Sequence, residues 1–331
     1  MRRIKAFFDP FLLVLLVTML LATILPARGD SARIAQGVTT AAVMLLFFLH
    51  GAKLSRQAIW HGAKAWKLHI ATLMTTFIAF PVLGLLIQQV SAIPPTLRGG
   101  LLFLALVPST VQSSIAFTAI ARGNVAAAVV SASFSNLLGI VLTPVLVTLL
   151  IAPGGMAGLS AGAAKGIVLQ LLLPFALGHA LRPWIGGLVD RHKTLVGRVD
   201  RGSIAMVVYT AFSAAVVEGL WQTVSTPQLV LVAALSCAML AIILLLTWAM
   251  GRMMGLPRED AIVLQFCGSK KSLASGVPIA GVLFPAAMVG PMVLPLMLFH
   301  QVQLIVCAML ARHYGAQADR AEQQQHRDGR T

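Results

Sequence analysis

The chain has 331 residues, of which 58% are hydrophobic and 11% are charged. Long apolar runs recur from Phe11 to Leu310, so the composition indicates an all-α polytopic membrane protein and excludes a soluble globular fold. The apolar residues form continuous blocks and do not alternate with polar ones, which argues against a transmembrane β-barrel. The formal charge of +15 could indicate a nucleic-acid partner, but nearly all Lys and Arg lie in short loops or at the chain ends. They form no basic face of the kind that binds a phosphate backbone, so we expect no nucleic-acid partner.

Ten apolar segments are long enough to be interpreted as helices that span a lipid bilayer. The first follows the basic stretch Met1–Lys5 and also has the form of a signal peptide, but the alternation of the later segments requires it as a span. In chain order the ten predicted spans are Phe11–Leu25, Ile34–Leu49, Leu68–Val90, Gly99–Ala121, Val125–Ile151, Ile167–Leu181, Ile204–Leu220, Leu229–Gly251, Ala261–Phe284 and Met288–Leu310.

The distribution of basic residues orients these ten spans. With the N-terminus inside, 19 Lys and Arg fall on the cytoplasmic side and 4 on the other, and the remaining two are Lys270 and Lys271. Basic residues are enriched in the cytoplasmic loops of membrane proteins. We therefore expect cytoplasmic N- and C-termini and a location in the inner (plasma) membrane of a bacterium.

The number of spans also predicts the domain organisation. Five spans end on the side opposite to their start, so the next five repeat them with inverted topology. We expect residues 1–155 to form the first inverted repeat (spans one to five) and residues 156–314 the second (spans six to ten). Residues 315–331 are polar and include three consecutive glutamines, which predicts a disordered cytoplasmic tail.

The ninth span carries a polar interruption, Gly268-Ser269-Lys270-Lys271-Ser272. A lysine at the centre of a spanning helix costs about 2.5–3.5 kcal/mol, so it is retained where it faces protein or a wet cavity. Together with Pro278, the interruption predicts two half-helices joined by an irregular segment. The fourth span carries a matching run, Pro108–Ser114. Interrupted spans at corresponding positions of two repeats predict the binding site of a secondary transporter.

The side chains near the two interruptions form the candidate site. Half-helices that begin near Ser113 and near Ser272 would present positive N-terminal ends to an anion. We expect Lys270 to line the cavity and Lys271 to help with the substrate or to reach a backbone carbonyl. The alternatives are a structural lysine satisfied by backbone oxygens and polar groups that only link helices. The candidates found from the residues alone are Gln112, Ser113, Ser114, Ser133, Asn136, Ser269, Lys270, Lys271, Ser272 and His300.

Acidic residues and cysteines limit the chemistry. All ten Asp and Glu lie outside the predicted spans or near their ends. A proton antiporter or an intramembrane protease needs carboxylates at depth, so both are disfavoured. The three cysteines lie inside apolar blocks without metal-ligand spacing. We expect no catalytic residues, no enzyme activity and no bound cofactor, with Na⁺ left open as a coupling ion.

Two regions of the sequence resemble the bile acid:sodium symporter family. The first is Val111–Ser114 continued by Ala121–Ala126 and Leu142–Pro144; the second, Gly268–Gly276, is similar to the sodium/bile acid cotransporter 7-like subgroup. The resemblance covers essentially all ten spans. It implies a core domain of spans three to five and eight to ten, a panel domain of the others, and broken helices that cross at spans four and nine and move by alternating access.

The resemblance also implies sodium sites, from which this sequence departs. Ser114 and Thr118 match the family, and Gln265 stands where a sodium-binding glutamate is expected. Ser114 and Gln265 are therefore the sodium candidates, and Thr118 and Gln265 join the candidate site. The other departures are Ile115 and Lys270, each at the place of an asparagine, and Ala128 and Ala132 at hydroxyl positions. We hypothesise that the Lys270 ammonium takes the role of the bound cation.

These observations favour a secondary active transporter of an organic anion, either bile-acid-like or another carboxylate, working by alternating access. Sodium symport and sodium-independent anion transport are both left open. A regulatory membrane protein of the same fold that does not transport, or a helix bundle that is merely kinked, is the alternative. The sequence does not specify the substrate, the direction of transport or the oligomeric state.

Overall fold

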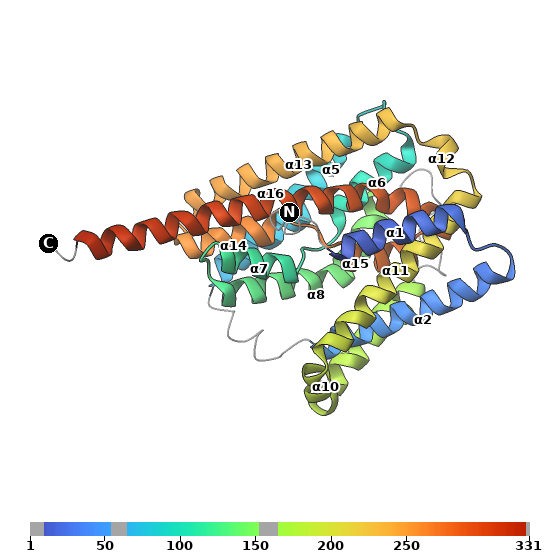
Figure 1. Cartoon of the computed structure of the whole chain (residues 1–331), viewed down its shortest axis with the longest axis horizontal. Helices are drawn as coiled ribbons and strands as arrows, with labels where there is room; N and C mark the ends of the chain where they lie inside the picture. The colour runs from blue at the N-terminus through green and yellow to red at the C-terminus, as the bar shows by residue number, and fades with distance from the viewer. Residues whose placement is uncertain (1–9, 54–64, 152–164, 329–331) are drawn as a thin grey trace.

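The computed structural model describes residues 10–53, 65–151 and 165–328 (Figure 1). In these ranges the chain forms helices and no strand. The helices are α1 (Pro10–Ile24), α2 (Asp30–Lys53), α4 (Trp66–Met74), the π-helix η3 (Thr75–Ala79), α5 (Phe80–Ile87), α6 (Pro95–Leu106), α7 (Gln112–Ile120), α8 (Val125–Leu150), the π-helix η4 (Val168–Leu172), α10 (Leu173–Arg191), α11 (Lys193–Val217), α12 (Leu220–Thr223), α13 (Thr226–Met253), α14 (Arg258–Gly268), α15 (Leu273–Leu283) and α16 (Ala286–Asp328).

Helical residues lie over each of the ten predicted segments. Two shorter apolar helices, Leu13–Ile24 and Pro95–Leu106, accompany six that are long and apolar enough to cross a membrane. An all-helical, multi-pass membrane protein is therefore confirmed, while the count of ten spans stays a prediction, as does the repeat boundary at residue 155, which lies outside the described residues. The six long helices are Asp30–Lys53, Trp66–Ile87, Val125–Leu150, Lys165–Arg191, Thr226–Met253 and Ala286–Arg320.

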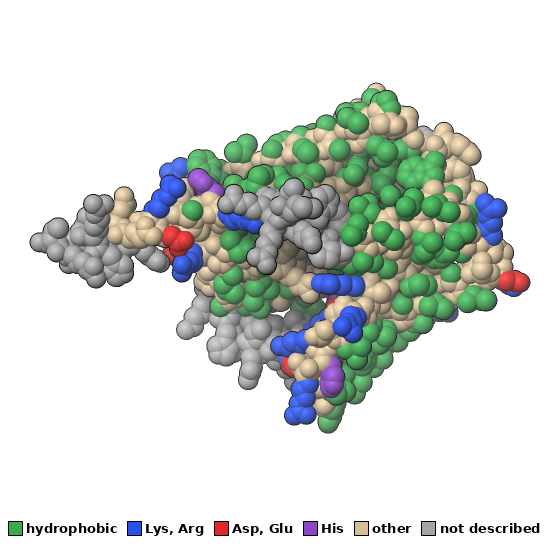
Figure 2. Space-filling view, in the orientation of Figure 1, with side chains coloured by type: hydrophobic (Ala, Val, Ile, Leu, Met, Phe, Trp, Pro, Cys, Tyr) green, Lys and Arg blue, Asp and Glu red, His purple; other side chains and the backbone are tan. Residues whose placement is uncertain are grey.

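The helices pack into two groups (Figure 1). In the first group, α2 packs against α10 and α11, and α1 packs against α11. In the second, α16 packs against α6, α7, α13 and α15, while α14 packs against α4, α7, α8 and α13. The groups meet where α11 contacts α15 and α16. Hydrophobic side chains cover much of the surface over α1 and α13, whereas basic side chains gather at the end where α10 and α11 meet (Figure 2).

Both interrupted spans are broken as the sequence predicts. The fourth is divided into α6 and α7, with residues 107–111 between them, and the ninth into α14 and α15, with residues 269–272 between them. Pro108 lies in the first break. Pro278, in contrast, lies inside α15 and does not cause the second break, which follows Gly268 and ends where the Ser272 hydroxyl caps α15 by accepting a bond from the Ser275 N–H at 3.1 Å.

The sequence predicts a disordered C-terminal segment, and this prediction is wrong for the described residues 315–328. From Gly315 to Asp328 the chain continues α16 as a regular helix. This stretch is rich in Ala, Gln and Arg, which are good helix formers, so a helix already stabilised by packing can extend through it. Its start is also anchored: the Arg258 side chain donates to the Tyr314 carbonyl at 2.6 Å, and Arg122 pairs with Asp319 at 2.9 Å.

Two glycines let α2 and α10 pack backbone to backbone. A side chain on Gly178 would collide with the Phe48 carbonyl, and one on Gly51 would collide with the Phe175 carbonyl. Elsewhere on α10, Gly187 is exposed and has no neighbouring atom within 4 Å of the position a Cβ would take.

We therefore expect Gly178→Ala to lower the thermal unfolding midpoint of the detergent-solubilised protein, because the new methyl group forces α2 and α10 apart. Gly187→Ala is the matched control on the same helix. It is expected to leave the midpoint unchanged or to raise it, since alanine is favoured over glycine in a helix by about 0.8–1.0 kcal/mol. Equal midpoints for the two variants would contradict this packing.

Candidate functional site

The breaks in the fourth and ninth spans contact each other directly. The Ser272 N–H donates to the Pro108 carbonyl at 2.8 Å. The Ser109 hydroxyl donates to the Cys267 carbonyl at 2.5 Å, and the Ser114 hydroxyl donates to the Phe266 carbonyl at 3.0 Å. Each irregular segment thus supplies partners for backbone groups that the other helix leaves open, which is the condition for non-helical chain inside a membrane protein.

Lys271 joins three carbonyls at this crossing. Its Nζ donates to the carbonyls of Thr76, Ala105 and Val107 at 2.8, 2.7 and 2.8 Å. A lysine has three N–H donors only as the ammonium ion, so the geometry fits the charged form. Its ammonium also lies 4.2 Å from the centre of the Phe80 ring, where a cation–π contact adds to the three hydrogen bonds.

The local sequence explains why these carbonyls are free. Ala105 and Val107 lie at the C-terminal end of α6, where the helix stops before their usual partners. In the π-helix η3, Phe80 N–H bonds to Thr75 O. The next bond of the same type would run from the N–H of residue 81 to Thr76 O, but residue 81 is proline and has no N–H. Lys271 therefore supplies the donor that Pro81 lacks.

Other polar side chains complete both breaks. Gln303 binds the Lys271 backbone on both sides: its Oε1 accepts from the Lys271 N–H at 2.8 Å, and its Nε2 donates to the Lys271 carbonyl at 2.9 Å. Thr143 donates to the Leu106 carbonyl at 2.9 Å. Asn136 donates to the Ser109 carbonyl at 2.6 Å. With these bonds made, the two joints are held as rigid, buried structure.

Lys270 points away from its neighbour. It is fully buried, and its Nζ donates to the Ser113 hydroxyl at 3.2 Å and lies 4.1 Å from the centre of the Phe117 ring. It is not among the described residues that line the cavity, so the expectation that Lys270 lines it is wrong. The ammonium lies one side chain behind the cavity wall, because Ser113 stands between.

A cavity of about 360 Å³ lies against the break crossing. Six of the candidate residues line it: Gln112, Ser113, Ser133, Asn136, Ser272 and His300. Gln112 and Ser113 begin α7, and Ser272 precedes the first residue of α15. The N-terminal ends of two half-helices therefore reach the same cavity, and its volume suits a small organic molecule.

The remaining candidates are buried behind the cavity wall. Ser114 bonds within the crossing, and the Ser269 hydroxyl donates to the Gln265 carbonyl at 2.5 Å. The Gln265 amide donates to the Leu244 carbonyl at 2.9 Å. The Thr118 hydroxyl is buried and has no hydrogen-bond partner in the described part of the chain. Both sodium candidates, Ser114 and Gln265, thus donate hydrogen bonds to backbone carbonyls.

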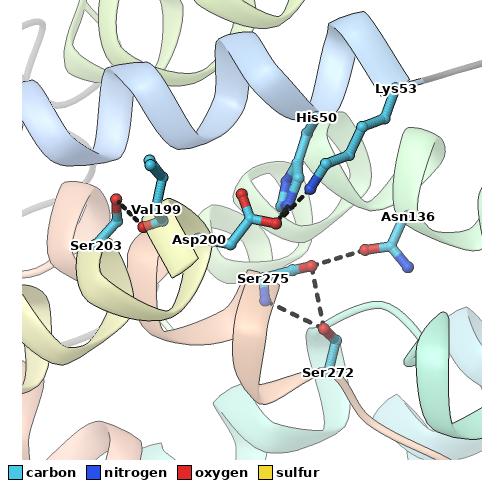
Figure 3. Close-up of polar contacts among 8 residues, drawn as sticks. All are labelled: His50, Lys53, Asn136, Val199, Asp200, Ser203, Ser272 and Ser275. Carbon is cyan, nitrogen blue, oxygen red and sulfur yellow. Dashed lines mark hydrogen bonds and ion pairs between the residues drawn. The ribbon is translucent and has the colours of Figure 1, made fainter. Parts of the chain in front are cut away.

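Sequence reasoning missed a charged group on the cavity wall. His50 and Lys53, at the end of α2, and Asp200, in α11, line the cavity opposite Asn136, Ser272 and Ser275 (Figure 3). Hydropathy begins the seventh span at Ile204, whereas α11 begins at Lys193. Asp200 lies outside the predicted seventh span, yet it belongs to a packed helix, and its side chain is only 14% exposed.

These contacts predict different roles for the two adjacent lysines. Lys271→Met leaves three buried carbonyls without a donor, at about 1–3 kcal/mol each, which is comparable to the whole stability of a typical protein. We expect little monodisperse protein in size-exclusion chromatography. Lys270→Met removes one hydrogen bond and two cation–π contacts, with Phe117 and Phe266, so it should leave a folded protein. A Lys271→Met variant as stable as the wild type would contradict the assignment.

The chain is similar to several known proteins over most of its length. A protein of Pseudomonas aeruginosa named as uncharacterized is 53% identical over 315 residues, covering 95% of each chain. The Escherichia coli protein YfeH, provisionally named a symporter, is 50% identical over 319 residues, covering 96% of each chain. Sodium/bile acid cotransporter 7 of Rattus norvegicus is 26% identical over 286 residues, covering 82% of each chain.

The profile of the SBF-like CPA transporter family matches residues 9–316. The match spans both breaks, the cavity and every described helix except the last part of α16. The matched family is a family of transporters, and the relatives include proteins named sodium/bile acid cotransporters, which indicates that the chain is not an enzyme and confirms the resemblance found in the sequence. The chain belongs to the SBF-like CPA transporter family.

Proposed function

We propose that this protein is a secondary active transporter that moves an organic anion by alternating access. The observation that carries the proposal is the convergence of two half-helix N-termini on one cavity. The backbone N–H groups at the start of α7 and α15 carry partial positive charge and attract an anionic group. Cavities at the meeting point of broken helices are the usual substrate sites of secondary transporters.

The cavity lining indicates the shape of the anion. Beside the polar residues of the two joints, the wall contains apolar side chains, namely Phe11, Phe47, Leu137, Ile140, Phe175, Ile279 and Leu304. A polar patch next to an apolar wall suits an amphipathic anion, with its charge at the joints and its carbon skeleton against the rings. Bile-acid-like molecules and other apolar carboxylates meet this description. Relatives named sodium/bile acid cotransporters support the same class.

The two helix groups supply parts that can move. We interpret the ten helical segments as ten spans in two inverted repeats. The helices of spans one, two, six and seven (α1, α2, η4, α10 and α11) form a panel, and those of spans three to five and eight to ten form a core. The cavity lies between residues of both groups, including Phe47 and Phe175 on one side and Ser133 and Ser272 on the other. Rocking of the core against the panel would expose it to each side in turn. The excess of Lys and Arg on one side of the ten predicted spans indicates that the N- and C-termini lie on the cytoplasmic side of a bacterial plasma membrane.

We propose further that transport does not require sodium. Lys270 brings a buried ammonium to the crossing, next to Ser113 and Phe117. A sodium ion about 4 Å from an ammonium would be repelled by about 4 kcal/mol at an effective dielectric constant near 20. Gln265 has no charge to offset this repulsion, and its amide is already bonded to Leu244 O. The open cavity also favours a carrier over a regulatory protein that has lost transport.

Uptake into proteoliposomes tests the function and the coupling together. We expect radiolabelled cholate to accumulate in liposomes containing the purified protein and not in empty ones, with equal initial rates in sodium and in choline buffer. A panel of smaller carboxylates, screened first by thermal stabilisation in detergent, covers substrates other than bile acids. Strong stimulation by an inward sodium gradient would contradict sodium independence, and absence of stabilisation by every carboxylate would contradict anion transport.

Lys270→Ala tests the role of the buried ammonium. We expect the variant to reach the membrane and to elute as a folded protein, but to lose transport, because the positive charge behind Ser113 is gone. Ser113→Ala keeps the ammonium and removes only its hydroxyl partner, so it should retain measurable uptake. Wild-type uptake rates in the Lys270→Ala variant would assign this lysine to structure alone.

A further inference from the structure

An ion pair lies on the cavity wall formed by the first helix group. Lys53 and Asp200 form a salt bridge through the Lys53 Nζ and the Asp200 Oδ2, and both residues line the cavity. The His50 Nε2 lies 4.0 Å from the same Asp200 oxygen. Figure 3 shows His50 and Lys53 reaching from α2 to Asp200, across the cavity from Asn136 and Ser275.

The two charges of this pair differ in their accessibility. The Lys53 side chain is 36% exposed, whereas that of Asp200 is 14% exposed. The Asp200 Oδ1 is buried and has no hydrogen-bond partner in the described ranges of the chain. A carboxylate normally accepts several hydrogen bonds, so Asp200 is an incompletely satisfied anion. The lysine, by contrast, is a flexible cation at the edge of the cavity that can turn toward another partner.

The position of Asp200 is set by a regular helix. Within α11 the Ser203 hydroxyl donates to the Val199 carbonyl at 2.9 Å, one turn around Asp200 (Figure 3). The Asp200 backbone is therefore part of a regular helix, and its short side chain has less reach than that of Lys53, so the lysine is the partner that can move further. An anionic substrate that enters the cavity therefore meets the Lys53 ammonium while this ammonium is paired with the Asp200 carboxylate.

We propose that Lys53 is a substrate-binding residue and that Asp200 is the internal anion it holds when the cavity is empty. This inference rests on the proposed function. The carboxylate of the substrate replaces that of Asp200 as the partner of Lys53, while the N-termini of α7 and α15 bind it from the other wall. The substrate then bridges the two helix groups, and Asp200 is left facing His50. No bond other than hydrogen bonds and ion pairs is made or broken.

This exchange makes Asp200 a competitor of the substrate. Removing the competitor should strengthen binding, and removing the cation should weaken it. A purely structural ion pair predicts something else, because loss of either partner would then affect stability and leave affinity for the anion largely unchanged. The two single variants therefore separate a binding role from a structural one by the sign of their effects.

The test measures equilibrium binding of radiolabelled cholate, or of the carboxylate that best stabilises the wild type, to the purified full-length protein. For Lys53→Met we expect affinity to fall about tenfold or more, as for loss of a hydrogen bond to a charged group. Lys53→Arg should keep most of the affinity. For Asp200→Asn we expect affinity to rise several-fold, since the amide is a weaker partner for Lys53. Arg122→Gln, which breaks the exposed pair with Asp319 away from the cavity, is the control and should change nothing.

The outcomes are distinguishable. If the wild type binds no carboxylate, the proposed function itself fails. If it binds cholate but Lys53→Met binds equally well, only the present inference fails. Weaker cholate binding in Asp200→Asn together with tighter binding in Lys53→Met would overturn the inference, because Asp200 would then support binding of the anion and not compete with it. If a single variant does not fold, the double variant Lys53→Met/Asp200→Asn, which leaves no unpaired charge, must still bind more weakly than the wild type for the inference to stand.

Discussion

The ammonium of Lys271 holds the two broken spans together. A break in a membrane helix exposes carbonyls that water cannot reach, and each unsatisfied group is costly. Lys271 satisfies three of them at once, one in η3 and two at the end of α6, at 2.7 to 2.8 Å. The positions of α7 and α15 depend on this contact. Each half-helix begins at the end of one of the two breaks, and Lys271 fixes these breaks against η3 and α6. The cavity exists where these two N-termini stop short of the first helix group.

The adjacent lysines illustrate how one irregular segment can perform two tasks. Consecutive residues of a non-helical joint point in different directions, so Lys271 turns toward α6 and η3 while Lys270 turns toward α7. Lys271 is fully engaged by backbone oxygens and has no donor left for a ligand. The Lys270 ammonium contacts one hydroxyl and two aromatic rings, and its charge acts on the cavity only through the wall. The first is a structural cation, and we assign the second to the electrostatics of the proposed anion site.

The cavity walls have different electrostatic character because they come from different helix groups. On the side of the breaks, positive potential comes from the N-terminal ends of α7 and α15 and from the buried Lys270 ammonium. The helix ends are part of the backbone, so their charge stays fixed in position. On the side of α2 and α11, charge comes from a lysine side chain paired with an acid. A ligand that contacts both walls can link the movements of the two helix groups, provided that it binds differently in the two conformations. The proposed transport cycle and the proposed partner exchange at Lys53 both use this asymmetry.

Much of the fold follows from local sequence. Hydropathy places helical residues on all ten segments, and the two polar runs identify both breaks, since apolar blocks and helix-breaking residues act over short distances. The tail is different. Residues 315–328 are polar enough to predict disorder, yet they continue a helix whose preceding turns are packed, and helix extension costs less than initiation.

The roles of individual site residues depend on tertiary contacts. The sequence alone determined that two lysines lie in an irregular joint, because their neighbours cannot continue a helix in an apolar segment. Only the tertiary structure decided that Lys271 meets the carbonyl left free by Pro81, almost 200 residues away, and that Lys270 lies behind Ser113. Asp200 was likewise placed in the cavity by the packing of α11 against α2. The physical reason is that hydropathy records how apolar a segment is, whereas the direction and partner of a polar side chain are set by distant parts of the chain.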